Sequence, residues 1–404
     1  LEYAHVDNVS DIVNGKKSPD ELGVKALDDY TFEVTLSESI PYLDKLVSHI
    51  VLAPVHQATV EKYGNQWTSP KHFVGNGAYK LKDWVVNERI VLERNPTYWD
   101  NDQTVIDEVT LLAITSENSA LNRYRSGEID MTQTIPVELF QRIKKELPQD
   151  VRITPYLCTY YYELNNQAPP FDDPRVRTAV KLALNTHIIA NKVVAQGQSP
   201  AFGFTPPFIN DMAAIEPEWF KLPQPERNAM AIKLLEAAGY NKSTPLKFKL
   251  LYNTLEAHKK VAIAIASILK QNAGIEVQLE NQEWKTFLDS RQQGTYQAAR
   301  AGWCADYNEP TTFLNIMLST SSNNSAHYQS AAYDAVLKDA VSAKTQDERI
   351  KAYQKAEQIL DEDSAIAPIY YYVNSRLVKP YVGGYTGNDP LGNFYTKDMY
   401  IIKH

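Results

Sequence analysis

The chain has 404 residues, and this length predicts about two or three domains rather than one core. Apolar residues make up 44% and charged residues 22%, which is typical of a globular protein. The net charge of −8, with both signs interspersed, argues against binding to the phosphate backbone of nucleic acids. No apolar run approaches the roughly 20 residues of a membrane-spanning helix, and no basic-then-apolar leader opens the sequence. The abrupt, helix-like start without Met predicts a processed chain or a fragment.

The first part of the chain predicts a mixture of strands and helices. Alternation of apolar and polar residues marks strands, and apolar residues three and four positions apart mark helices. In chain order we expect a strand at 30–36, short helices from Pro41 and at 56–62, a hairpin within 75–99 turning at Asn87–Glu88, a strand at 105–114, helices at 118–127 and 137–147, and a long strand at 151–166.

The second part alternates helix and strand more regularly. We expect helices at 174–185, 227–240, 257–274, 284–294 and 349–363, and strands at 246–254, 275–281, after 294 and at 367–378. This order predicts an α/β fold whose lobes contain mixed sheets. No repeat and no low-complexity linker is present, so we expect the lobes to exchange strands.

Common signatures of enzymes and metal sites are absent. The sequence lacks GxSxG, HExxH and GxxxxGK[ST], and GNGAYK (75–80) lacks the third glycine of a dinucleotide fingerprint. The eight histidines are scattered and the two cysteines lie 146 positions apart, so no metal-ligand spacing is visible. We therefore expect no cofactor and no metal. A folded site can still gather distant residues, so an enzyme is disfavoured rather than excluded.

The segment RAGWCADYNEP, from Arg300 to Pro310, concentrates chemistry behind an apolar run. Catalysis, metal binding and ligand capture are all compatible with these residues alone. Cys304 and Cys158 each lie in a strand-like, aromatic-flanked run. Two buried free thiols and one disulfide are equally compatible with that pattern. A reactive thiol is disfavoured, because no histidine lies within twenty residues of Cys304.

Several long motifs resemble one known family. They include LCTYYYELNNQ, FDDPRVRTAVKLAL, NQEWKTFLDSR and RAGWCADYNEPTTFLN, and the resemblance extends over essentially the whole chain. The sequence is similar to the periplasmic oligopeptide-binding proteins of peptide ABC importers, within the family 5 solute-binding proteins. The resemblance implies a periplasmic-binding-protein type II-like fold, residence in the periplasm and a monomer. It also implies a non-catalytic receptor that captures short peptides with a free N-terminus and delivers them to membrane permease subunits.

The resemblance also implies a division into lobes and an absent N-terminal portion. Residues 1–55 would be the remainder of a small lobe, and 56–157 with 366–404 the lobe that carries the termini. Residues 158–365 would form the opposing ligand-binding lobe. Ligand would bind between the two main lobes, which close by a hinge motion.

The resemblance assigns roles to residues of this clamp. Asp306 would pair with the α-ammonium of the peptide, although a surface aspartate before a turn is the simpler interpretation. Gly302 and Cys304 would offer main-chain groups to the peptide, with Cys304 bonded to Cys158. Arg300 and His258 would meet the peptide carboxylate. Two alternative interpretations remain open. Arg300 could instead form a structural ion pair, and His258 could be an exposed histidine at the start of a helix.

Other residues would shape the side-chain pockets, and one departs from the family pattern. Trp284, Trp303 and Tyr372 would line pockets with Glu163 near the cleft, although such aromatic residues more often belong to a core. Close relatives have a lysine where this chain has Val194, so we expect weaker dipeptide binding. Two alternative functions remain. The first is that the same fold binds murein peptide, a nickel complex or a sugar. The second is a peptidase that uses Asp306, Glu163 or His258 as acid or base.

Overall fold

The computed structural model describes residues 5–403, and their contacts divide the chain into two compact units. Unit 1 comprises Leu1–His49, Leu157–Val194 and Gln198–Tyr372. Unit 2 comprises Ile50–Tyr156, Ala195–Gly197 and Val373–His404. The long strands β6 (Val151–Leu164) and β11 (Ile366–Leu377) are each divided between them in sequence. The three-lobe division implied by the resemblance stays a prediction.

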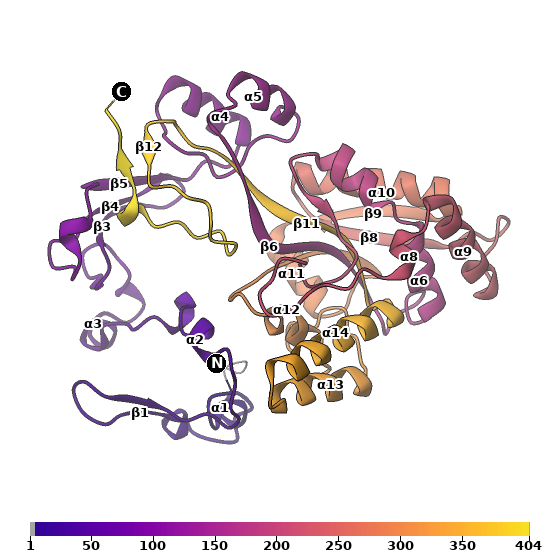
Figure 1. The fold of residues 1–404 in the computed structure, drawn as a ribbon, viewed down its shortest axis with the longest axis horizontal. Helices are drawn as coiled ribbons and strands as arrows, with labels where there is room; N and C mark the ends of the chain where they lie inside the picture. The colour runs from indigo at the N-terminus through magenta and orange to yellow at the C-terminus, as the bar shows by residue number, and fades with distance from the viewer. Residues whose placement is uncertain (1–4, 404) are drawn as a thin grey trace. The chain divides into compact units, whose positions relative to one another are not determined.

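Unit 1 is built on a six-stranded mixed sheet (Figure 1). Its order is β7-β11-β6-β10-β8-β9, with β7 at Ser199–Pro200, β8 at Lys247–Asn253, β9 at Glu276–Gln282 and β10 at Ala298–Cys304. β8 pairs in parallel with β9 and β10, whereas β10 and β6 run antiparallel. The predicted α/β class with mixed sheets is therefore confirmed.

Helices of unit 1 bury apolar residues against this sheet. α6 (Pro174–Ala183), α9 (Gln224–Ala237) and α10 (Glu256–Ala273) contribute Val180, Leu235 and Ile265 to the largest core, together with Leu250 of β8. A second cluster joins Phe287 of α11 (Trp284–Gln292) to Leu251, Tyr296 and Ala299. Neighbouring residues of a strand, such as Leu250 and Leu251, thus enter different cores, as the alternation of side chains requires.

Local signals explain where several of these helices begin and end. Asp173 caps α6 by accepting a hydrogen bond from the Arg175 amide, and Pro174 occupies the first turn. α10 ends at Gly274, whose φ of 68° suits glycine. α14 (Gln346–Asp363) starts with a reciprocal capping box between Thr345 and Glu348.

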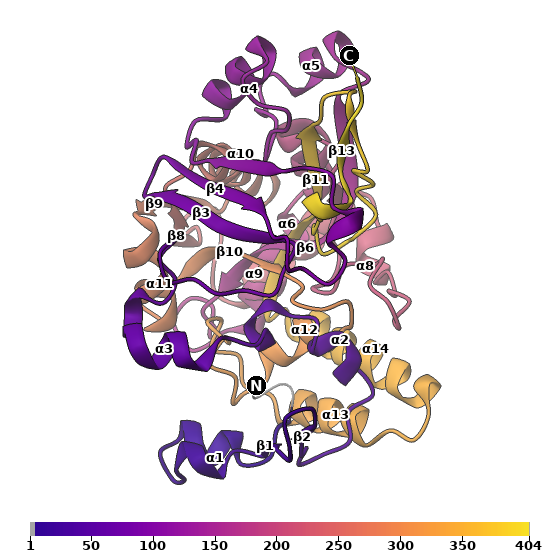
Figure 2. The same ribbon diagram turned by 90° about the vertical axis from the view of Figure 1, so that its left-hand side faces the viewer.

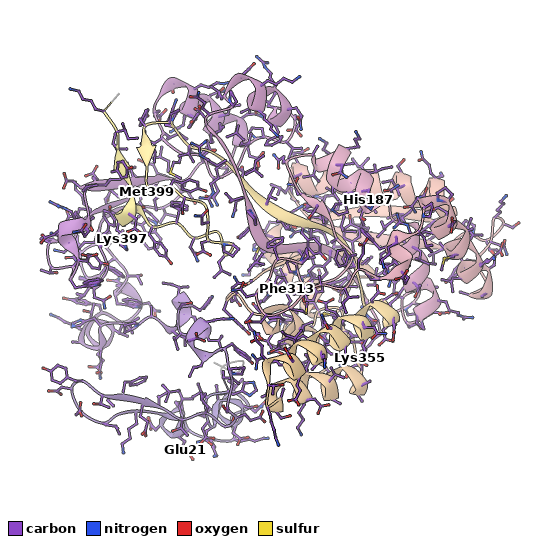
Figure 3. All side chains as sticks on the ribbon, viewed as in Figure 1. Glu21, His187, Phe313, Lys355, Lys397 and Met399 are labelled. Carbon is purple, nitrogen blue, oxygen red and sulfur yellow. A yellow bond between two sulfur atoms is a disulfide. The ribbon has the colours of Figure 1, made fainter. Side chains whose placement is uncertain are left out.

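The remaining helices of unit 1 include one that the sequence analysis missed. α13 (Ala331–Ser342) is capped by Ser330 and lies beside α14 (Figures 1 and 2). Phe313, labelled in Figure 3, comes from α12 (Thr311–Leu314) and is fully buried, with its ring edge-on to that of Phe204. The shorter elements are α7 (Thr186–Ile188), the π-helix Ile189–Val194, α8 (Glu218–Lys221) and the 3-10 turn Asn315–Met317.

The N-terminal segment of unit 1 has its own small cluster. Its buried members are Val6, Val9, Ile40, Tyr42, Leu46 and Tyr307. Its elements are α1 (Val9–Val13), the 3-10 turn Pro19–Glu21, β1 (Val24–Ala26), β2 (Phe32–Val34) and α2 (Leu43–Leu46). Tyr307 comes from the loop that follows β10, so this cluster joins the N-terminal segment to the region RAGWCADYNEP (300–310).

Unit 2 contains a three-stranded antiparallel meander. Its strands are β3 (Tyr79–Val85), β4 (Arg89–Arg94) and β5 (Glu108–Leu112), and the hairpin turns at Asn87 with a φ of 61°, as predicted. Its core gathers Leu121, Tyr124, Phe140, Ile143 and Leu377. The other elements are the 3-10 turns Ile50–Leu52, Gly64–Gln66, Asn101–Gln103 and Thr396–Asp398, the helices α3 (Gln57–Tyr63), α4 (Glu117–Ser126) and α5 (Phe140–Glu146), and the strands β12 (Val382–Gly383) and β13 (Tyr400–Ile401).

Candidate functional site

The pairing of β10 with β6 organises the site. Arg300, Gly302 and Cys304 lie opposite Tyr162, Tyr160 and Cys158. Cys304 and Cys158 form a disulfide, and their Cα atoms are 4.0 Å apart. This short separation is typical of an antiparallel pair that does not exchange main-chain hydrogen bonds. Hydrogen-bonded and non-hydrogen-bonded pairs alternate along such a ladder. The next pair is accordingly hydrogen-bonded, because the amide of Ala305 donates to the Leu157 carbonyl at 2.8 Å.

This alternation fixes where the main-chain groups of β10 point. In an antiparallel ladder, residues of non-hydrogen-bonded pairs turn their N–H and C=O groups away from the partner strand. Arg300, Gly302 and Cys304 therefore direct these groups away from β6. On that second side, β8 pairs with β10 only at Ala298 and Ala299. Within residues 5–403, the edge from Arg300 to Cys304 carries no further main-chain partner.

A basic and aromatic cluster surrounds Arg300. Its guanidinium lies over the ring of Tyr160, 4.8 Å from the centroid, and donates to the hydroxyl of Tyr372 at 2.8 Å. His258 of α10 packs near the same ring, with centroids 5.6 Å apart. Burial, and secondarily the positive charge of Arg300, lower the pKa of His258 to about 3. This imidazole is therefore neutral at physiological pH, beside a permanent cation.

Asp306 follows β10 and presents a half-exposed carboxylate. Its amide donates to the hydroxyl of Thr312 at 2.9 Å, which holds the loop. Its Oδ1 lies 3.5 Å from Nε2 of His49, and 47% of its side chain is exposed. Partial burial raises the pKa of Asp306, while the charge and hydrogen bond of His49 oppose that rise. The arrangement suits the recognition of a positive group.

A buried ion pair lies beside this edge. Glu163 accepts two hydrogen bonds from Arg291 of α11, at 2.8 and 2.6 Å, and its side chain is 2% exposed. The bidentate geometry satisfies both carboxylate oxygens.

Comparison with known proteins identifies the family. The family model described as "Bacterial extracellular solute-binding proteins, family 5 Middle" matches residues 3–325. The chain belongs to this family. It is 62% identical, over all of its length and 75% of the relative, to the periplasmic oligopeptide-binding protein OppA of Salmonella typhimurium.

Solved structures agree with the family. One is the complex of Haemophilus influenzae OppA with RPPGFSPFR, with a TM-score of 0.90, 50% identity, and coverage of 100% of this chain and 79% of that one. Another is the Escherichia coli murein tripeptide-binding protein MppA, with a TM-score of 0.93, 43% identity and the same coverage. The predicted family membership is confirmed.

All predicted site residues of this solute-binding protein belong to unit 1. Arg300, Gly302, Trp303 and Cys304 share β10, and Asp306 follows directly. Trp284 opens α11 with half of its surface exposed, and its ring stacks on Phe287 at 5.9 Å. The predicted disulfide is present. His258 is 8% exposed, so the alternative of an exposed helix-start histidine is wrong. The binding roles themselves stay predictions.

Three contacts of the site were missed in the sequence. His49 beside Asp306, Arg291 on Glu163 and Tyr160 beneath Arg300 are separated from their partners by more than a hundred positions. No local spacing signals such pairs. For the described residues, no helix is long and apolar enough to span a membrane, and no group of three His, Cys, Asp or Glu could hold a metal ion.

Proposed function

We propose that this chain is the periplasmic receptor of an ABC importer that captures short peptides and passes them unchanged to the membrane permease. The observation that carries the proposal is the unpaired edge of β10, which leads directly to the carboxylate of Asp306. A peptide is the ligand that needs both features, because it has a hydrogen-bonding backbone and an ammonium group at one end.

The edge of β10 accounts for affinity that is independent of peptide sequence. Gly302 and Cys304 would pair with the peptide as an added strand, a mode in which main-chain hydrogen bonds give affinity. A strand rises about 3.3 Å per residue, so the edge from Arg300 to Cys304 is about 13 Å long. That length matches three or four peptide residues. At Gly302 an added Cβ would lie 2.9 Å from an Arg300 nitrogen, so a larger residue there would displace the Arg300 side chain.

Asp306 would bind the peptide ammonium, and Arg300 with His258 would meet its carboxylate. Every unmodified peptide has both terminal charges, so these contacts select peptides without selecting side chains. Truncating one member of a desolvated pair costs about 2–5 kcal/mol. Because Asp306 is half exposed, the lower end of that range applies, which is about 30-fold in affinity.

Trp284, Trp303 and Tyr372 would border the space for peptide side chains, with the Glu163–Arg291 pair behind them. Trp303 has a buried indole N–H without a hydrogen-bond partner in the described part of the chain. A donor of this kind can bind a water molecule, and bridging water lets one site accept varied side chains. We propose no catalytic step and no cofactor.

The first test is native mass spectrometry of the protein as purified, followed by identification of whatever it releases under denaturing conditions. The proposal expects a heterogeneous set of intact short peptides with free N-termini, one per chain. A single non-peptide ligand or a murein peptide would replace it with a narrower binding function of the same fold. Cleavage of added peptide over time would favour a peptidase.

A second test isolates Asp306. We expect Asp306→Asn to weaken binding of trialanine about 30-fold, and N-acetylation of trialanine to weaken binding to the unmodified protein to a similar extent. Because both changes remove the same ion pair, combining them should add little further loss. Additive losses would show that the ammonium and Asp306 act separately.

A further inference from the structure

A buried network of hydrogen bonds supports the loop that carries Asp306. The side chain of Asp306 is 47% exposed, so its carboxylate is accessible to water and to a ligand. The residues of the network are all buried: they are Tyr307, Glu309, Thr311, Thr312 and Tyr353. The loop therefore presents one accessible acidic group on a base from which water is excluded.

Glu309 is the centre of this network. Its Oε1 accepts a hydrogen bond from the hydroxyl of Tyr353 at 2.5 Å. Its Oε2 accepts from the amide of Thr311 at 2.8 Å and also from the hydroxyl of the same residue. The Thr311 hydroxyl in turn lies 2.8 Å from that of Tyr307. A carboxylate is costly to bury unless it is hydrogen-bonded, and here the donors come from the loop itself and from α14.

Thr312 connects this network to Asp306. Its hydroxyl oxygen accepts a hydrogen bond from the amide of Asp306 at 2.9 Å. Thr312 belongs to α12, and its own amide donates to the carbonyl of Glu309 at 3.2 Å. The main chain of Asp306 is therefore tied to a short helix that starts beside Glu309.

α14 provides a rigid support for the loop. Tyr353 lies within this helix of 18 residues, and α12 lies beside α14 (Figures 1 and 2). Binding groups that are supported by regular elements and by further hydrogen bonds are held more precisely than groups on an isolated loop. The hydrogen bond from Tyr353 to Glu309 therefore couples the loop to a helix whose position does not depend on the ligand.

We propose that Thr312, Glu309 and Tyr353 are positioning residues that hold Asp306 where it meets the ammonium group of a peptide. The inference rests on the proposed function, in which Asp306 binds that group. Because the network fixes the loop before a peptide arrives, binding does not have to order it, and less affinity is lost. Breaking one of these hydrogen bonds should therefore weaken the ligands that use Asp306 and leave other ligands unaffected. A purely structural role would instead change the affinity of all peptides alike, or only the stability of the fold.

The first test compares Thr312→Val with Thr312→Ser by isothermal titration. Valine keeps the shape of threonine but lacks the oxygen that accepts from the Asp306 amide, whereas serine keeps this oxygen. In Thr312→Val, binding has to restore the position of the carboxylate, so we expect about five-fold weaker binding of trialanine. N-acetyl-trialanine has no ammonium group, and its affinity should change less than about two-fold. Thr312→Ser should recover most of the trialanine affinity.

Tyr353→Phe tests the more remote hydrogen bond. It removes the donor to Glu309 Oε1, and we expect about three-fold weaker binding of trialanine with little change for N-acetyl-trialanine. The matched control is Tyr328→Phe, which removes another buried tyrosine hydroxyl bonded to a carboxylate of α14, that of Asp363. This control should lower the stability of unit 1 without changing the affinity for trialanine. Thermal unfolding of each variant establishes that it is folded.

A double variant identifies the group through which Thr312 acts. In Asp306→Asn the ion pair is already lost, so adding Thr312→Val should weaken trialanine binding further by less than about two-fold. The positioning role is overturned if the two losses add, if Thr312→Val weakens both peptides equally, or if it leaves both affinities unchanged. Absence of trialanine binding to the unmodified protein would instead overturn the proposed function.

Discussion

Glu163 and Arg291 offer a decisive test of whether a predicted site residue acts on the ligand or on the fold. Arg291→Met removes the guanidinium and leaves a carboxylate that is 2% exposed without its partner. Breaking a buried pair from one side costs about 3–5 kcal/mol, because the remaining charge is neither solvated nor compensated. We therefore expect Arg291→Met to reduce the free energy of unfolding of unit 1 by about that amount.

Replacing both members should restore most of this loss. In the double variant Glu163→Leu/Arg291→Met no charge is left buried, and such replacements are often neutral or stabilising. Urea unfolding followed by tryptophan fluorescence measures the difference as a shift in midpoint at constant slope. The matched control is Arg125→Met in the surface pair Arg125–Glu146, where both side chains are 39% exposed and the expected cost is below about 1 kcal/mol.

The reasoning would be refuted if Arg291→Met were no more destabilising than Arg125→Met, or if the double variant were as unstable as the single one. Peptide affinity of the double variant then separates the two roles of Glu163. If the pair only supports the sheet, a restored fold binds trialanine normally. If Glu163 contacts the ligand, affinity falls although stability has recovered.

Three further predictions concern His258, Gly302 and Val194. The pKa of His258 is lowered from an ordinary 6.5 to about 3, so between pH 7.5 and pH 5 the unfolded chain binds a proton at this residue and the folded chain does not. The free energy of unfolding of unit 1 should therefore fall by about 2 kcal/mol from pH 7.5 to pH 5. Chemical denaturation at both pH values measures this loss, and a His258→Phe variant that loses as much would contradict the assignment. Gly302→Ala places a methyl group 2.9 Å from a guanidinium nitrogen of Arg300 and displaces that side chain, so we expect about ten-fold weaker trialanine binding; unchanged affinity by calorimetry would mean that the position of the Arg300 guanidinium does not affect binding. Val194→Lys should tighten dialanine binding about ten-fold with little change for trialanine, and equal dialanine affinities would remove the proposed cause of weak dipeptide binding.

The sequence predicted the elements of this protein better than their contacts. The strand at 151–166, the helix opened by Pro174 and the hairpin turning at Asn87 rest on periodicity, capping and turn chemistry within a few residues, and all three are present. α13 was missed although Ser330 caps it. The Ser- and Asn-rich segment before it is a turn signal, and Ser330 is a suitable cap, so the sequence contained a signal for this helix that was not used.

The same distinction applies to the candidate site, where residues close together in sequence could be predicted and contacts between distant residues could not. Arg300, Gly302, Cys304 and Asp306 lie within seven positions, so a motif could point to them. The position of His49 beside Asp306 depends on the packing of Tyr42 against Tyr307, which no spacing encodes. Contacts that arise only when remote segments pack together must come from a structure.

The disulfide and the proposed peptide edge follow from a single property of the β10–β6 ladder. Cys304 meets Cys158 at a non-hydrogen-bonded position, where paired side chains come closest. Every second residue of β10 has the same orientation, so the N–H and C=O groups of Gly302 necessarily point away from β6. A shift of one residue in register would separate the two cysteines and also turn the edge of Gly302 inward. The covalent bond between the strands therefore stabilises the one register in which β10 can accept another strand.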